Sequence, residues 1–196
     1  MDNKTNILNC ALNLFSQKGF EGVSVQQLVN EAKITKPTLY YYYKSKEGLY
    51  NKLLDNYYTE LNNQLKSISN YTPNPNNYHE DIYPVLDRII NTYFTYAKNN
   101  PQFYRIILSN QYMPKSSPIY EMSHSFDNIQ YQIILDTFTN MANVHTNLKK
   151  NVTKLTWSFI GLINTYIGLF LQDNSFELSS NLSKELVHQF MHGIHA

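Results

Sequence analysis

Hydroxyl-bearing side chains and three lysines gather near the N-terminus of this 196-residue chain, in the run KPTLYYYYKSK. Lysine can neutralise a phosphate or donate to guanine O6 and N7, and threonine offers a methyl group and a hydroxyl. Tyrosine hydroxyls can bond phosphates. These residue types suit contact with double-stranded DNA, and the candidates are Ser24, Gln26, Gln27, Lys36, Thr38, Tyr40, Tyr41, Tyr42 and Lys46.

The pattern around these residues predicts two short helices joined by a tight turn. Ser24 is a candidate N-cap, and Gln27 completes a capping box with it. Thr35 can cap the second helix, and Pro37 then falls in the first turn, where a missing N–H costs least. This is the arrangement of a helix-turn-helix, whose second helix enters the major groove.

The tyrosines of the second helix must divide between the core and the surface. Tyr40 and Tyr43 lie three residues apart, so one of them is expected to face inward. We expect Tyr43 inside and Tyr41 outside. For any single tyrosine of this run, packing in the core is the alternative to a DNA contact.

The longer run TKPTLYYYYKSKEGLY resembles the recognition-helix signature of TetR-family transcriptional regulators, a T-L-Y core followed by an aromatic residue and K-x-K-E-x-L. The resemblance extends back through the first quarter to third of the chain, at Phe15, Gly19, Phe20, Val23, Leu28, Val29 and Ile34. It departs from the pattern at Tyr43, where many members carry Phe, and at Gln26, where some carry Arg. The resemblance adds Pro37 to the residues expected to contact DNA. It also implies dimerisation and a C-terminal effector domain.

Composition favours a globular protein with a local DNA patch. Hydrophobic residues make up 42% of the chain, charged residues 16%, and the formal net charge is +1. Residues 1–48 contain six lysines and four acidic residues, so any excess of positive charge there is small.

The single cysteine, Cys10, excludes an internal disulfide and is expected to be a buried thiol, with redox sensing as the alternative. The N-terminus lacks an apolar signal-peptide core, so we expect a cytoplasmic protein.

Helical periodicity predicts an all-α fold of about nine helices. A three-helix DNA-binding domain is expected over residues 1–46, and a larger effector-binding and dimerisation domain over 47–196. The first helix is expected over 4–18. After the two short helices of the helix-turn-helix, further helices are expected over 46–69, 81–99, 102–109, 119–143, 147–172 and 177–194.

Aromatic residues of the larger domain are candidates for lining an effector pocket that suits an apolar or flat ligand. Aromatic residues at helical spacing are also typical of an ordinary core, which is the alternative for each of them. The main candidates are Tyr93, Phe94, Phe103, Tyr104, Phe126, Trp157 and Tyr166, and further candidates are Met113, Met122, Tyr131, Phe138 and Phe159.

The uncharged stretch 155–172 approaches the length of a membrane span, but polar residues interrupt it, and we expect a buried or interface helix. Gly161 and Gly168 allow close helix approach. They are expected to mark a dimer seam, with a tight contact inside one subunit as the alternative. The seam is expected to include Trp157, Gly161, Asn164, Gly168, Leu182, Leu186 and Phe190.

These features predict a regulator that binds a palindromic operator as a homodimer, and the resemblance to the TetR family implies a repressor that is released by a small apolar or aromatic ligand. Activation is the alternative sign of regulation, and a small-molecule-binding helical protein without a DNA role is the alternative function. The sequence contains no glycine-rich phosphate loop, no H-E-x-x-H motif and no nucleophile with an evident base, so we do not expect an enzyme. His188, His192 and His195 near Glu185 could hold zinc, but a solvated helix end is expected, with no metal or cofactor.

Overall fold

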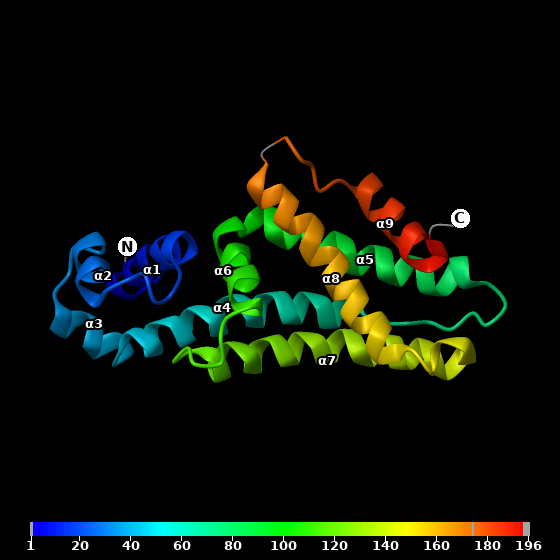
Figure 1. The fold of residues 1–196 in the computed structure, drawn as a ribbon, viewed down its shortest axis with the longest axis horizontal. Helices are drawn as coiled ribbons and strands as arrows, with labels where there is room; N and C mark the ends of the chain where they lie inside the picture. Colours follow the sequence, from blue (N-terminus) through cyan, green and yellow to red (C-terminus); the bar gives the residue numbers. More distant parts are fainter. Residues whose placement is uncertain (1, 174, 194–196) are drawn as a thin grey trace. The chain divides into compact units, whose positions relative to one another are not determined.

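The computed structural model describes residues 2–173 and 175–193, and every regular element in these ranges is helical (Figure 1). The all-α prediction is therefore confirmed. The nine α-helices of the described residues are α1 (Asn3–Lys18), α2 (Val25–Glu31), α3 (Lys36–Tyr43), α4 (Lys46–Ile68), α5 (Tyr78–Asn99), α6 (Pro101–Gln111), α7 (Tyr120–Val144), α8 (Val152–Gln172) and α9 (Ser180–His192), and a short 3₁₀ helix covers Thr146–Leu148.

Packing divides the chain into two compact units. The first holds the described residues up to Thr59 together with Asn100–Asp127, and the second holds Glu60–Asn99 together with the described residues from Asn128 on. Helices α4 and α7 contribute residues to both units. The expected domain boundary after Lys46 stays a prediction about function, because packing groups the first three helices with α6 and parts of α4 and α7.

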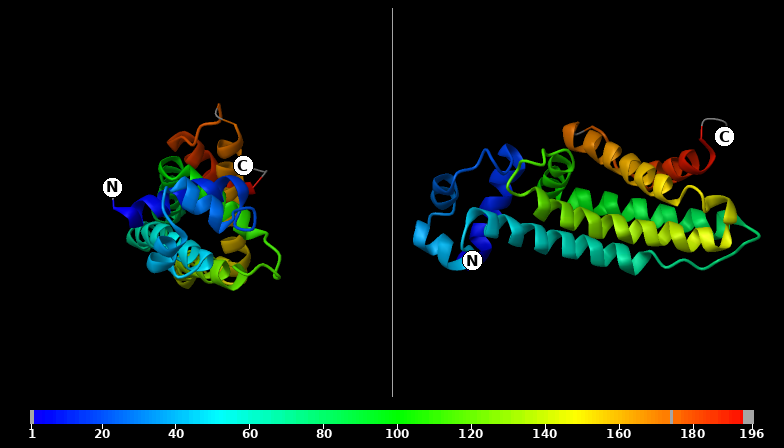
Figure 2. Two further views of the ribbon diagram at one scale, coloured as in Figure 1. Left: turned by 90° about the vertical axis from the view of Figure 1, so that its left-hand side faces the viewer. Right: turned by 60° about the horizontal axis from the view of Figure 1, so that its bottom comes forward.

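The core of the first unit is built from aromatic contacts between α1, the turn after it and α4. Phe15 and Phe20 each meet the ring of Tyr50, with ring centroids 5.0 Å apart in both pairs. Helix α1 also packs on α2 and on α6 (Figure 2). The three N-terminal helices are thus fixed to one another and to the helices that follow them within this unit.

In the second unit, α5 packs against α8 and α9, and three phenylalanines form its centre. Phe159 of α8 lies 5.6 Å from Phe138 and 5.1 Å from Phe190 between ring centroids. The start of α5 carries a buried carboxylate, Asp81, which accepts a hydrogen bond at 2.7 Å from Nε2 of the buried His145. This pair joins the start of α5 to the segment that follows α7.

Three predicted helix starts were wrong, and the first of them is that of α5, which begins at Tyr78 rather than near residue 81. Helix α8 begins at Val152 rather than near residue 147, because Asp81 holds His145 in place and the chain forms the 3₁₀ helix before α8 can start. Helix α9 begins at Ser180 rather than at 177, because Ser179 is its N-cap and accepts from the Leu182 N–H at 3.1 Å. The predicted end of that helix at Ile194, like His195, lies outside the described residues.

Candidate nucleic-acid interface

The two helices of the candidate interface begin at the caps that the sequence predicts. The Ser24 Oγ accepts from the Gln27 N–H at 3.2 Å, and the Gln27 Oε1 accepts from the Ser24 N–H at 2.8 Å, so the capping box is confirmed. The Thr35 Oγ1 accepts from the Thr38 N–H at 3.4 Å, and Pro37 lies in the first turn of α3. Both helix starts are therefore specified by local hydrogen bonds.

Tyr43 and Leu39 attach α3 to the rest of the first unit. Leu39 is fully buried and Tyr43 is only 5% exposed. The Tyr43 hydroxyl donates to the Lys4 carbonyl oxygen of α1 at 2.8 Å, which supplies the partner that a buried tyrosine needs. Burial also raises the pKa of Tyr43 to about 12. The prediction that Tyr43 faces inward is confirmed.

The opposite face of α3 is open to solvent. Tyr41 is 73% exposed and Tyr40 is 42% exposed, and Lys36 and Pro37 are exposed as well. Tyr42 is half-buried and meets the Tyr41 ring edge-on at 5.1 Å. A short helix with buried Leu39 and Tyr43 on one side therefore presents hydroxyls and one ammonium group on the other.

The remaining candidates on α2 lie at its start. Ser24 and Gln26 are exposed, and the Gln26 Nε2 donates to the Asn30 Oδ1 at 2.8 Å. Gln27 is half-buried and uses its side-chain oxygen in the capping box. Ser24 and Gln26 are thus better placed to reach a DNA backbone than Gln27, and the contacts of all three with DNA stay predictions.

Lys46 has an internal role that sequence reasoning missed. Its Nζ donates to the carbonyl oxygens of Phe20 at 3.0 Å and Val23 at 2.9 Å, and it lies 4.0 Å from the Phe20 ring centroid. Two of its three N–H donors are therefore used within the protein, and its expected phosphate contact stays a prediction. The lysine ties the start of α4 to the turn that leads into α2.

The residues predicted to line an effector pocket divide between the two units. Tyr93, Phe94, Phe103 and Tyr104 are almost fully buried, while Tyr166 is half-buried and meets Phe176 at 6.1 Å between ring centroids. Phe103, Tyr104 and Phe126 belong to the first unit, and Tyr93, Phe94, Trp157 and Tyr166 to the second. Their role in ligand binding stays a prediction.

The second unit contains a cavity of about 520 Å³ that sequence reasoning missed. Apolar side chains from α5, α7, α8 and α9 form much of its wall, and His79 and His192 lie at its polar side. Of the aromatic residues predicted for the ligand, Phe138 lines it and the others do not. The apolar lining residues are Ile82, Leu86, Phe138, Leu148, Leu155, Phe190 and Met191.

Helix α8 has two different faces. Its inward stripe is Thr156, Phe159, Ile160, Ile163, Ile167 and Leu171. On the other side Trp157 is 55% exposed and stacks on Tyr131 at 4.5 Å between ring centroids, and a Cβ added at Gly161 would meet nothing within 4 Å. Gly161 therefore makes no tight contact with the described residues of its own subunit. By length and hydropathy α8 could also cross a membrane, and a third of that stretch is buried.

The predicted dimer residues of α9 face their own unit more than the surface. Leu186 is 2% exposed, and Phe190 is half-buried against Phe159. Leu182 is half-buried, as are Asn164 and Gly168 of α8. The residues with most surface left for a partner are thus on α8, and the dimer seam as a whole stays a prediction.

The architecture is that of a helical protein with an N-terminal helix-turn-helix, in which one face of the second helix, α3, is exposed. Residues 7–53 match the family model of bacterial regulatory proteins of the tetR family. The chain is 38% identical over 69 residues to the HTH-type transcriptional regulator YuxN of Bacillus subtilis, covering 35% of this chain and 24% of that protein. It is also 38% identical over 53 residues to IcaR of Staphylococcus epidermidis, a negative regulator of the biofilm operon icaADBC, covering 27% of this chain and 29% of IcaR.

Across its whole length the chain shares its fold with a solved regulator. The transcriptional regulator FadR from Bacillus subtilis, in complex with stearoyl-CoA, superposes with a TM-score of 0.73 at 14% identity, covering 97% of this chain and 99% of FadR. The match to the first two curated relatives spans under a third of their length. The N-terminal part of the chain is therefore a DNA-binding domain of the tetR family, and the chain as a whole has the fold of solved TetR-family regulators.

Proposed function

We propose that this protein is a transcriptional repressor that binds a palindromic DNA operator as a homodimer and is released by a small apolar ligand. The exposed face of α3 carries this proposal: Tyr40, Tyr41 and Lys36 are open to solvent while Leu39 and Tyr43 fix the helix from behind. Such a helix suits insertion into the major groove, with hydroxyls and an ammonium group as donors. The negative regulation named for IcaR supports repression.

The homodimer is proposed to form through α8. One short reading helix contacts only a few base pairs, and a symmetric dimer reads two half-sites. The exposed Trp157 and Leu169 and the open space around Gly161 leave an apolar face with room for a second helix. A helix with such a face is typical of a subunit interface, which we prefer to a membrane span.

The effector is proposed to be apolar and to bind in the second unit. The cavity of about 520 Å³ there has the size of a small-molecule site and a largely apolar wall. The solved FadR structure contains stearoyl-CoA, a molecule with a long apolar chain, which supports an apolar ligand. Helix α4 contributes residues to both units and is the proposed route by which ligand binding weakens DNA binding.

The proposal places the protein in the bacterial cytoplasm, with operator DNA, a second copy and one small molecule as its partners. It gives the chain no catalytic role, since the relatives matched here are named as regulators. A ligand-binding protein without a DNA role would leave the exposed hydroxyl face of α3 without a purpose.

The experiment is DNA binding by the purified full-length protein, measured by fluorescence anisotropy with its own upstream DNA and with random DNA. We expect upstream DNA to bind at least about 10³-fold more tightly than random DNA. Lys36→Ala and Tyr41→Ala should each weaken that binding about tenfold or more. Lys66→Ala, which changes an exposed lysine near the end of α4, is the matched control and should leave it unchanged.

The operator could also lie away from the protein's own upstream DNA. A second experiment therefore selects bound DNA from a random library, with and without cell extract. If neither arm yields a sequence bound better than random DNA, the protein is not a sequence-specific regulator. Equal losses in Lys36→Ala and Lys66→Ala would show that binding is nonspecific attraction to positive charge.

A further inference from the structure

The lining of the cavity in the second unit changes from buried apolar side chains to exposed polar ones. Ile82 and Leu86 of α5 and Phe138 of α7 are almost fully buried, whereas His79 and His192 are exposed. On α5, His79, Ile82 and Leu86 stand at positions i, i+3 and i+7, so they share one face of the helix. This face leads from the polar rim to the apolar inner wall, which suits a ligand with an apolar chain and one polar head.

Two imidazoles at the rim are available to bind the head of such a ligand. The rings of His79 and His192 lie 5.9 Å apart between centroids and are tilted by only 27°. Neither ring forms a hydrogen bond with another described residue. Each imidazole keeps at least one N–H donor in either protonation state. Because both side chains are exposed, their rings can turn so that one N–H of each meets an oxygen of the same carboxylate.

The charged groups around the rim favour an anion over a cation. Among the described residues, no aspartate or glutamate lines the cavity. The two acidic residues in the first turn of α5 are bonded elsewhere: Asp81 accepts from His145 and three other donors, and Glu80 accepts from the Asn74 Nδ2 at 2.7 Å. A hydrogen bond from an imidazole to a carboxylate is charge-assisted and stronger than one to a neutral group.

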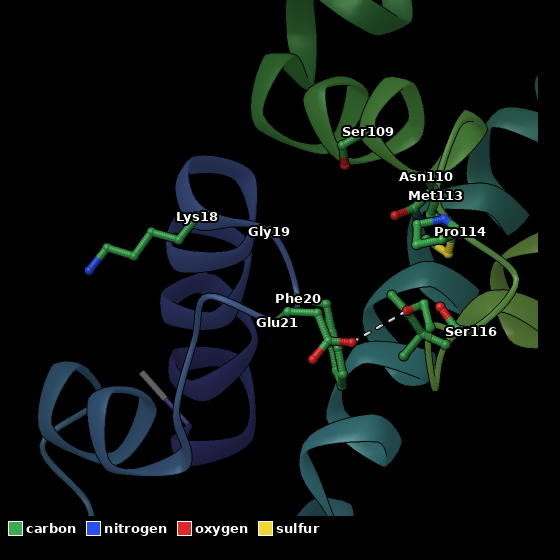
Figure 3. Close-up of a pocket in the computed structure, with 11 residues that line it drawn as sticks. Lys18, Gly19, Phe20, Glu21, Ser109, Asn110, Met113, Pro114 and Ser116 are labelled. Carbon is green, nitrogen blue, oxygen red and sulfur yellow. Dashed lines mark hydrogen bonds between the residues drawn. The ribbon is translucent and has the colours of Figure 1, made fainter.

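The cavity of the first unit has the opposite character. It measures about 370 Å³ and lies between the end of α1 and the loop after α6 (Figure 3). Its wall includes the Glu21 carboxylate, which accepts from the Ser117 Oγ at 3.5 Å, while the Lys18 side chain points away from the other lining residues. A carboxylate ligand is therefore expected in the cavity of the second unit and not in this one.

We propose that the cavity in the second unit binds an aliphatic carboxylate. Its head accepts from His79 and His192, and its chain lies against Ile82, Leu86 and Phe138. The bound head would join the start of α5 to the end of α9. This inference names the ligand class of the proposed effector site. Only the effect of the ligand on DNA rests on the proposed function, and its binding does not.

The test uses decanoate as the probe, in isothermal titration calorimetry on the full-length protein without DNA and below the concentration at which the probe forms micelles. Decanol and decylamine have the same chain with a neutral and a cationic head. We expect decanoate to bind about tenfold more tightly than either, because only its head accepts two charge-assisted hydrogen bonds. From hexanoate through octanoate to decanoate, affinity should rise about fourfold for each added CH₂.

Two variants and two controls identify the site. His79→Ala and His192→Ala change exposed residues, keep the fold, and should each weaken decanoate binding about tenfold with a smaller effect on decanol. His124→Ala changes an exposed histidine of α7 in the first unit and should have no effect. Glu21→Gln changes the cavity of the first unit and should also have no effect.

Decylamine or decanol binding as tightly as decanoate would overturn the carboxylate head, and so would unchanged decanoate binding in both histidine variants. Equal losses for decanoate and decanol would show that the histidines shape the cavity and do not bind the head. All these results are obtained without DNA. A protein that binds decanoate as expected but no specific DNA would contradict the proposed regulator alone, and the reverse result would contradict the carboxylate site alone.

Discussion

Tyr43 joins α3 to α1 through one side-chain hydrogen bond, from its hydroxyl to the Lys4 carbonyl oxygen at 2.8 Å. Tyr43→Phe keeps the buried ring but removes that donor. We expect the free energy of unfolding to fall by about 1 kcal/mol. The measurement is denaturant unfolding, with Tyr41→Phe as the matched control because that ring is 73% exposed. Equal stability in the two variants would show that the Lys4 contact adds nothing.

Asp81 is the residue whose buried charge holds the loop between α4 and α5. Its carboxylate accepts from the Tyr71 hydroxyl at 2.7 Å, the Asn74 N–H at 2.9 Å and the Ile82 N–H at 2.6 Å, in addition to His145. Burial raises the pKa of Asp81, but these hydrogen bonds, first that from His145, outweigh burial and lower it below the ordinary value of 3.8.

Asp81→Asn turns one acceptor oxygen into a donor that faces other donors, and should lower the free energy of unfolding by about 2–3 kcal/mol at pH 7. Because the folded-state pKa is depressed, the stabilisation by Asp81 is present above pH 3.8 and is lost as the pH falls through the folded-state pKa. The difference in the free energy of unfolding between the wild type and the variant should therefore become smaller below pH 3.8, as measured by denaturant titrations. A gap independent of pH would mean that the ionised carboxylate is not the stabilising species. The exposed Glu80→Gln is the control.

Among the elements, those with local capping signals could be predicted from sequence and those fixed by distant residues could not. Ser24 and Thr35 mark the starts of α2 and α3 because a cap bonds a backbone N–H three residues away. The start of α8 depends on His145 meeting Asp81, which is 64 residues away in the chain. No periodicity in the sequence indicates that contact.

The features of the candidate sites also fall into those that helical spacing predicts and those that depend on contacts between distant segments. The outward position of Tyr41 and the inward position of Tyr43 follow from helical spacing, and both were predicted. The internal bonds of Lys46 join segments 23 and 26 residues apart, so only the folded chain brings them together.

Helix α8 yields a prediction about assembly. A Cβ at Gly161 meets nothing within 4 Å inside the chain, so Gly161→Leu should leave the fold of a single subunit intact and even favour the helix by about 0.5–1 kcal/mol. If α8 is the dimer seam, the larger side chain should prevent close approach of a second copy. Sedimentation should then show a monomer.

The control for this change is Thr139→Leu, which alters an exposed residue of α7, outside the α8 face, and should leave the dimer intact. A Gly161→Leu protein that remains dimeric would place the seam away from this face of α8. A protein that unfolds would show instead that Gly161 has a contact within its own subunit.

For the molecule as a whole, the formal net charge of +1 means that salt-dependent DNA binding must come from a few lysines near α3. Each phosphate contact made by a lysine contributes about one unit to the slope of log affinity against log salt. If Lys36 neutralises a phosphate in each subunit of a dimer, Lys36→Gln should reduce that slope by about 2 and weaken all sequences alike. If Lys36 donates to guanine, the variant should lose discrimination at one position of each half-site with less change in slope.

Anisotropy titrations at several salt concentrations, on operator DNA and single-base variants, separate these outcomes. Lys66→Gln should change neither quantity, and a Lys36→Gln protein that also changes neither would remove Lys36 from the interface.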